Sequence, residues 1–118
     1  MSQGALFVGW GAIIAGREKS AARVLGEARQ YLQGLQSRGL IDSAELVLLE
    51  PHGGDLEGFV LIKGEREAIA RLRIDPEFTA VIVGVQLVHQ KVGVVGAHTG
   101  AALGALLQTW DQQEARLL

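Results

Sequence analysis

The stretch TAVIVGVQLVHQKVGVV, residues 79–95, is apolar along most of its length. Taken in steps of two, it has two largely apolar faces: Val81, Val83, Val85 and Leu87 on one, and Ile82, Gly84, Gln86, Val88 and Val92 on the other. A strand with one face in water alternates apolar with polar residues, and this stretch alternates only weakly. We therefore predict one long strand over residues 79–95, in a sheet that is covered on both faces. A chain of 118 residues is too short to supply both covers, so we expect a partner chain to supply the second.

The segments around this stretch predict alternating strands and helices. In chain order they are a strand over residues 4–14, a helix over 17–38, strands over 44–49 and 58–63, a short helix over 65–72, a helical turn at 75–78, the strand over 79–95 and a helix over 101–117. Apolar residues of the first helix recur at three- and four-residue spacing, which predicts one buried stripe. This stripe consists of Ala22, Leu25, Ala28, Leu32 and Leu35. The turn-rich segment EPHGGD at 50–55 predicts an antiparallel hairpin between the second and third strands.

This order of elements is the split βαβ pattern of an α+β, ferredoxin-like βαββαβ antiparallel sheet. Both crossover helices are expected on one sheet face, and the opposite, bare face is apolar. Packing two such faces together in a twofold dimer would bury both. We expect residues 1–118 to form a single domain, with a core over about 5–95. The extra C-terminal helix, about 101–117, would latch over the sheet edge or onto the partner.

Composition excludes several classes of function. The net charge is -2 and the basic residues are scattered, which argues against a nucleic-acid partner. The chain has no cysteine, so disulfides and thiolate metal ligands are excluded. Its apolar run over residues 5–15 is too short to span a bilayer and lacks the flanks of a secretory signal, so we expect a cytoplasmic protein without a membrane partner. Three separated histidines provide no short-spaced ligand pair, and we expect neither a metal nor another cofactor.

Two histidines are candidates for acid–base chemistry. His52 and Asp55 lie three residues apart across a Gly-Gly turn, where imidazole and carboxylate would form a pair. The alternative is a solvated hairpin turn with polar residues. His89 shares a predicted strand face with Val85 and Leu87, so it would point into a pocket and titrate near neutrality. The alternative for His89 is a partly buried histidine at a strand end or a dimer edge.

Two other residues are candidates for ligand binding. Trp10 would wall a pocket for an aromatic ligand, or else serve as a core or interface aromatic without a ligand. Arg17, at the start of the first predicted helix, would hold an anionic group beside the helix N-terminus, or else be a solvated helix end. The glycines at 9, 11 and 16 do not match the G-x-G-x-x-G spacing, so the sequence does not predict a phosphate loop.

The chain resembles the dimeric α/β-barrel superfamily from residue 5 to about residue 95. The resemblance is carried by the strand–Gly16–helix opening, the hairpin with Asp55 and Gly58-Phe59, and the segment DPEF at 75–78 before the long strand. It implies a homodimer with a cleft between sheet and helices, and little about chemistry. The cofactor-free monooxygenases of that superfamily use Asn and Trp in the cleft. This chain has Trp10 but no asparagine, and it lacks both the early His–Asp pair of another branch and a distinctive axial histidine for haem.

Three hypotheses for function follow. The first is a homodimer that binds a small organic molecule in the cleft, which Trp10 would line. The second is a cofactor-independent monooxygenase or isomerase for small or aromatic substrates, with His89 or His52 as base. The third is a structural or interaction protein without a ligand, in which side chains fill the cleft. The sequence leaves open whether the protein is an enzyme.

Overall fold

The structure, a computed structural model, describes residues 3–118. Its elements are β1 (Gln3–Trp10), α1 (Glu18–Ser37), β2 (Ser43–Leu48), β3 (Gly58–Glu65), α2 (Arg66–Arg73), α3 (Pro76–Val88), β4 (Gly93–Ala97) and α4 (Gly100–Leu117). The four strands form one sheet in the order β2-β3-β1-β4, and every neighbouring pair is antiparallel. This is the predicted ferredoxin-like α+β fold.

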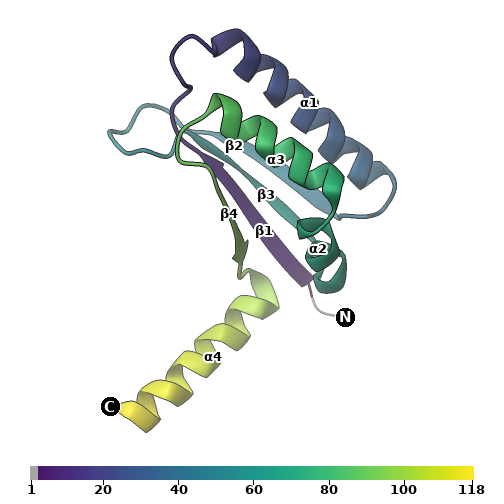
Figure 1. Ribbon diagram of the computed structural model, residues 1–118. Coiled ribbons are helices and arrows are strands. Elements are labelled where there is room, and N and C mark those ends of the chain that lie inside the picture. The colour runs from purple at the N-terminus through teal and green to yellow at the C-terminus, as the bar shows by residue number, and fades with distance from the viewer. Residues whose placement is uncertain (1–2) are drawn as a thin grey trace.

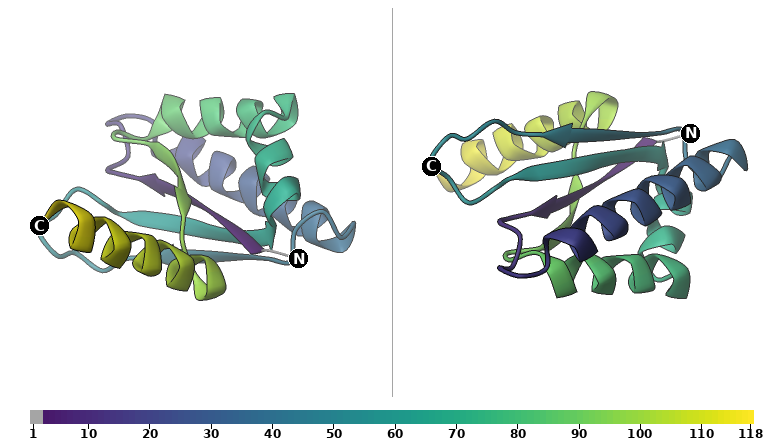
Figure 2. Two further views of the ribbon diagram at one scale, coloured as in Figure 1. Left: turned by 90° about the horizontal axis from the view of Figure 1, so that it is seen from below. Right: turned by 90° about the horizontal axis from the view of Figure 1, so that it is seen from above.

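Helices α1, α2 and α3 cover one face of this sheet, as predicted, with α1 and α3 side by side (Figures 1 and 2). The core lies between these two layers. Its most deeply buried side chains are Leu6 of β1 and Ile62 of β3, which pair across the two strands. The predicted stripe of α1 is slightly misplaced, because Ala22 is exposed while Ala21 is buried.

The predicted strand over residues 79–95 is wrong. Residues 76–88 form the helix α3, and only Gly93–Ala97 form the fourth strand. The helix begins where Asp75 caps it, since Asp75 Oδ1 accepts a hydrogen bond of 2.8 Å from the Glu77 N–H. Pro76 follows at the first helical position, where its missing N–H costs nothing. Helix α3 is apolar around much of its circumference because it packs against both α1 and the core.

This correction changes which residues lie on the bare sheet face. The face opposite the helices, which we call the open face, carries Phe7, Val47, Phe59, Leu61 and Val95. The predicted members from residues 81–88 lie instead in the helical layer, where Val85 and Val88 are buried. On the open face the rings of Phe7 and Phe59 stack with centroids 5.2 Å apart. The open face is therefore largely apolar, as predicted, but different residues make it so, and it also carries the charged residues Glu45 and Lys63.

Helix α4 projects away from the rest of the molecule (Figure 1). None of its residues is buried, and it meets the remainder of the chain mainly at β1. Within residues 3–118, no helix combines the length and the apolar character needed to cross a membrane.

Candidate functional site

A cavity of about 340 Å³ lies between the sheet and the two helices α1 and α3. Val8 and Val60 line it from the strands, and Leu32, Phe78 and Val85 line it from the helices. These are apolar side chains of core elements, so the walls of the cavity are set by the fold itself. The predicted cleft between sheet and helices is thus present, and Leu25 and Leu32 border it without filling it.

Trp10 forms one wall of the cavity at the end of β1 and is 7% exposed. Its cross-strand partner is Gly58, where a Cβ atom would lie 2.9 Å from Cζ2 of the indole. Real Cβ atoms essentially never come this close to a neighbour, so glycine at 58 leaves the space that the indole occupies. Trp10 is thus a buried core aromatic and a cavity wall at the same time.

His89 borders the same cavity beside Trp10, with the two ring centroids 5.9 Å apart. It follows the last residue of α3, and its backbone N–H donates to the Val85 carbonyl at 2.9 Å. Its Nδ1 lies 2.9 Å from the Gly11 carbonyl oxygen, which only accepts, so Nδ1 carries the proton. In the neutral ring, Nε2 is then a hydrogen-bond acceptor. The structure brings together Trp10 and His89, although His89 comes from a helix end and not from a strand.

Tyr31 of α1 also lines the cavity, as do Arg29, Gln33 and Gln36 of the same helix, and sequence reasoning missed all four. Burial raises the pKa of Tyr31 to about 12, and the negative charges of Asp75 and Glu77 add to this effect, while Arg38 opposes it. The phenol is therefore neutral at ordinary pH and can donate or accept a hydrogen bond. A signal was available, because Tyr31 lies three residues after Ala28 on the inward side of α1.

Arg17 does not line the cavity. It lies just before α1, and its Nη1 donates a hydrogen bond to the carbonyl of Leu87 near the end of α3. A cation at this place is favourable, since the C-terminal carbonyls of a helix carry partial negative charge. In this structure Arg17 therefore connects the loop before α1 to α3.

His52 and Asp55 lie in the exposed loop between β2 and β3, outside the cavity, and they bind different partners. His52 Nδ1 accepts from the Gly54 N–H at 3.3 Å, so Nε2 donates to the Leu56 carbonyl at 2.7 Å. Asp55 Oδ2 lies 2.7 Å from Lys91 Nζ, and this hydrogen bond lowers the pKa of the carboxyl group. The two candidates for an acid–base pair are thus not hydrogen-bonded to each other here.

The part of the chain that the structure describes contains no cluster of three or more His, Cys, Asp or Glu side chains suited to a metal ion. The cavity combines mostly apolar walls with the polar side chains of Arg29, Tyr31, Gln33, Gln36 and His89. It can bind an apolar body and hydrogen-bond a polar group on it.

No family model matches this chain, and no curated protein matches it. Among solved structures, a DABB family protein from Mesorhizobium loti with a ferredoxin-like fold is 14% identical, with a TM-score of 0.63 over 84% of this chain and 99% of its own. A dimeric protein of unknown function with a ferredoxin-like fold, from Bacteroides fragilis, is 11% identical, with a TM-score of 0.62 over 82% and 96%.

A third solved structure is SnoaB, a cofactor-independent oxygenase from Streptomyces nogalater. It is 13% identical, with a TM-score of 0.52 over 84% of this chain and 97% of its own. Identities this low establish a shared fold and leave the chemistry open. The chain thus shares the ferredoxin-like fold of these proteins, and the ferredoxin-like fold that its resemblance implied is confirmed.

Proposed function

We propose that the protein is a homodimer that binds a small organic molecule in the cavity between the sheet and helices α1 and α3. The observation that carries this proposal is the cavity itself, with its apolar walls and its polar groups at His89 and Tyr31. Tight packing is the rule inside proteins, so an opening of this size beside an indole is an unusual core feature.

The size of the cavity fits a ligand of one or two rings. Its volume of about 340 Å³ is at the lower end of the range of roughly 300–1,000 Å³ that is typical of small-molecule sites. An engineered apolar cavity of about 150 Å³ holds one benzene molecule. A bicyclic aromatic compound therefore suits the cavity, and Trp10 offers it a flat wall.

The polar groups at the cavity favour a ligand that carries a hydrogen-bond donor. The Nε2 atom of His89 accepts in the neutral ring, so a hydroxyl or N–H on the ligand would pair with it. Arg29, Gln33 and Gln36 of α1 also line the cavity and offer further hydrogen bonds. Phenols and similar hydroxylated aromatics supply the donor that His89 can accept.

The open face supports the homodimer. A contiguous apolar patch of several side chains on a soluble protein is commonly an interaction surface. A twofold axis would bury Phe7, Phe59, Leu61 and Val95 of both chains at once, since such an interface is self-complementary. The Bacteroides fragilis protein with the same fold is described as dimeric, which agrees with this arrangement.

The second hypothesis, a cofactor-independent oxygenase or isomerase, uses the same cavity. SnoaB, an oxygenase of this kind, shares the fold, and His89 would act as the base, because its Nε2 accepts in the neutral ring. The absence of asparagine weakens the match to the monooxygenases that the chain resembles. An unfilled cavity argues against the third hypothesis, a purely structural role without a ligand.

The two tryptophans make a direct binding test possible. Trp10 lies in the cavity wall, whereas Trp110 lies on α4 and is 66% exposed. In a ¹⁵N-labelled sample, titration with 1-naphthol should shift the indole N–H signal of Trp10 and leave that of Trp110 in place. Naphthalene lacks the donor and should bind about tenfold more weakly, which corresponds to about 1.4 kcal/mol, and 1-naphthoate tests whether Arg29 at the cavity admits an anion.

A matched pair of variants on α1 tests whether the ligand binds in the cavity. Ala28 borders the cavity and Ala22 is exposed on the same helix, so Ala28→Phe should fill the cavity and abolish the shift while Ala22→Phe preserves it. A Trp10 signal that none of the three probes moves would contradict the proposal. For the enzyme hypothesis, a bound phenol should be converted under oxygen, and His89→Gln should stop conversion while retaining binding.

A further inference from the structure

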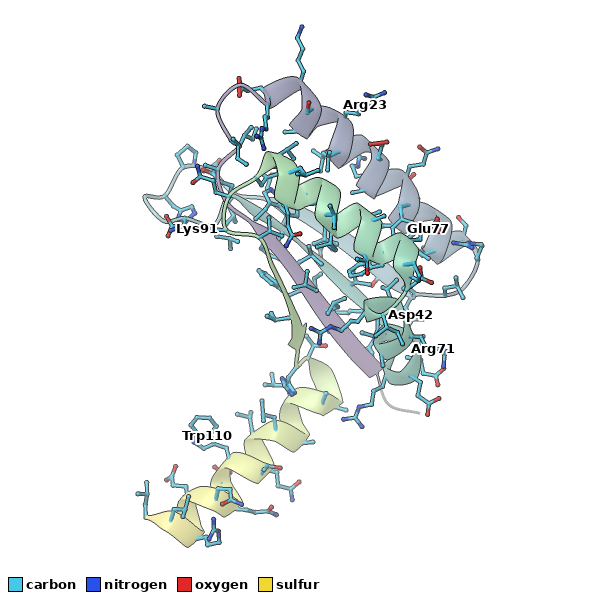
Figure 3. The ribbon with its side chains drawn as sticks, viewed as in Figure 1. Arg23, Asp42, Arg71, Glu77, Lys91 and Trp110 are labelled. Carbon is cyan, nitrogen blue, oxygen red and sulfur yellow. The ribbon has the colours of Figure 1, made fainter. Side chains whose placement is uncertain are left out.

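Helix α4 presents an apolar stripe that no residue within the described range 3–118 covers. The stripe consists of Leu103, Leu106, Leu107 and Trp110, spaced three and four residues apart on one side of the helix. These side chains are 41%, 38%, 55% and 66% exposed. The labelled Trp110 ring stands clear of the body in Figure 3.

Such a helix is not expected to stand alone. An isolated helix shorter than about 12–15 residues is marginal in water, and one of 18 residues is only slightly beyond this limit, so most helical stability comes from packing. The chain is also unusually extended, because its radius of gyration is 16.2 Å. A compact chain of this length would have about 13.5 Å. The shape and the exposed stripe both indicate that α4 is built to pack on another molecule.

We propose that the other molecule is a second copy of this chain, and that each α4 clasps the partner of the homodimer with its apolar stripe. This inference rests on the homodimer proposed above. Helix α4 starts three residues after β4, which is an edge strand of the sheet. It lies on the side of the molecule away from α3 (Figure 2), and a partner that covers the open face would lie on that side.

The areas involved support this occupant. Four strands about 4.8 Å apart and about 20 Å long give the open face roughly 380 Å². That is about half of the roughly 800 Å² per partner that a standard stable interface buries. One side of α4, taken as a cylinder about 27 Å long and 10 Å wide, contributes roughly 420 Å² more. Only with α4 included does the apolar surface of one chain reach the size of a stable interface.

The charges of α4 argue against a membrane surface as the occupant. Helices that lie on membranes carry many Lys and Arg residues on their polar side. Helix α4 has Arg116 as its single basic residue, with Asp111 and Glu114 of opposite charge. A self-complementary protein partner needs no such basic side.

Two double variants of the full chain test the clasp. Leu106→Asp with Trp110→Asp places two charges in the stripe, and Gln108→Asp with Gln112→Asp places the same charges at the same spacing on the opposite side of α4. Sedimentation equilibrium should show a dimer Kd raised about 100-fold for the first variant and by less than about threefold for the second. Both should keep their folded core, because no α4 side chain is buried in the chain itself.

The outcomes separate this inference from the homodimer. If the stripe variant dimerises as tightly as the wild type, the clasp is overturned while the homodimer stands. If the wild type is a monomer at about 100 μM, well above an ordinary micromolar Kd, both are overturned.

Cross-linking then identifies the surface that α4 touches. The chain has no cysteine, so Asp111→Cys at the border of the stripe takes a single photo-reactive label. Labelled chain is mixed with excess ¹⁵N chain that carries no label, and mass spectrometry distinguishes the two. We expect cross-links from α4 of the photo-labelled chain to residues 3–97 of the ¹⁵N chain. Cross-links only within the photo-labelled chain, or only between two α4 helices, would overturn the clasp.

Discussion

Helices α3 and α4 are both rich in apolar residues, yet their surroundings differ completely. Helix α3 packs against α1 and shares the hydrophobic core with the sheet, and it buries Phe78, Val85 and Val88. Helix α4 buries no residue and leaves Trp110 66% exposed. Apolar content therefore indicates which helices must pack against another surface. Within residues 3–118, α3 finds such a surface and α4 does not. The predictions below test this difference, beginning with the largest effect.

The inner and outer sides of α3 should respond very differently to charge. Val85→Asp places a carboxylate at a buried position against the apolar core and should cost about 5 kcal/mol, comparable with the whole stability of a small domain. Val83 is 45% exposed on the same helix, and Val83→Asp should cost about 1 kcal/mol or less. Circular dichroism and urea unfolding at one protein concentration would measure both. A folded Val85→Asp variant would contradict the position of α3 in the core.

Aromatic truncation compares the two helices directly. Phe78 of α3 is 4% exposed, so Phe78→Ala should lower the free energy of unfolding by about 3–5 kcal/mol through lost burial and a new cavity. Trp110→Ala should change it by about 0.5 kcal/mol or less in a dilute, monomeric sample. At concentrations where the clasped dimer forms, the Trp110→Ala variant should become clearly less stable than the wild type. An equal loss at every concentration would mean that Trp110 packs within its own chain.

Sequence patterns predicted the fold better than they predicted individual elements. The antiparallel sheet, the hairpin and α1 were all predictable, because alternation, turn residues and helical spacing were each distinct there. Residues 79–88 were predicted as a strand because valines and isoleucines occupy all sides, so no period distinguishes a buried helix from a buried strand. The helix start was visible at Asp75-Pro76, and extending that turn by three turns would have given α3.

The candidate site was predictable in part. The structure places Trp10 and His89 together at the cavity, although the reason given for His89 was a strand face that does not exist. Tyr31 was missed because a tyrosine on an amphipathic helix suggests no function until the sheet opposite it is known. No sequence pattern reveals a cavity, since its volume depends on how side chains from five separate elements pack.

The pKa of Tyr31 measures how well water is excluded from the contact between α1 and the core. It is the single tyrosine of the chain, so alkaline titration of tyrosinate absorbance should give its pKa, expected at about 12 instead of the ordinary 10.0. Because the folded state favours the neutral phenol, this stabilisation is fully present below about pH 10 and is lost as the pH rises toward about 12. Tyr31→Phe should therefore lose less stability than the wild type across that range. A pKa close to 10 would show that Tyr31 is solvated and that the layer is open.

Substitutions of His52 and Asp55 in the loop between β2 and β3 should have the smallest effect on stability. Both residues are exposed, and neither contributes to an apolar surface. Changing His52 and Asp55 to Ala removes the hydrogen bonds to Leu56 and Lys91, both at exposed positions. Ion pairs in water stabilise little, so the melting temperature should move by less than about 2 °C. Since the pKa of Asp55 is lowered, any contribution of its carboxylate to stability is present above its ordinary pKa of 3.8 and disappears as the pH falls below it.

Lys91→Gly is the control, because it removes the same ion pair and also releases a residue held at a φ of 53°. If the melting temperature falls by many degrees in the Ala variant and not in Lys91→Gly, then His52 stabilises the loop. Exposure would then be an insufficient guide to which parts of this molecule contribute to its stability.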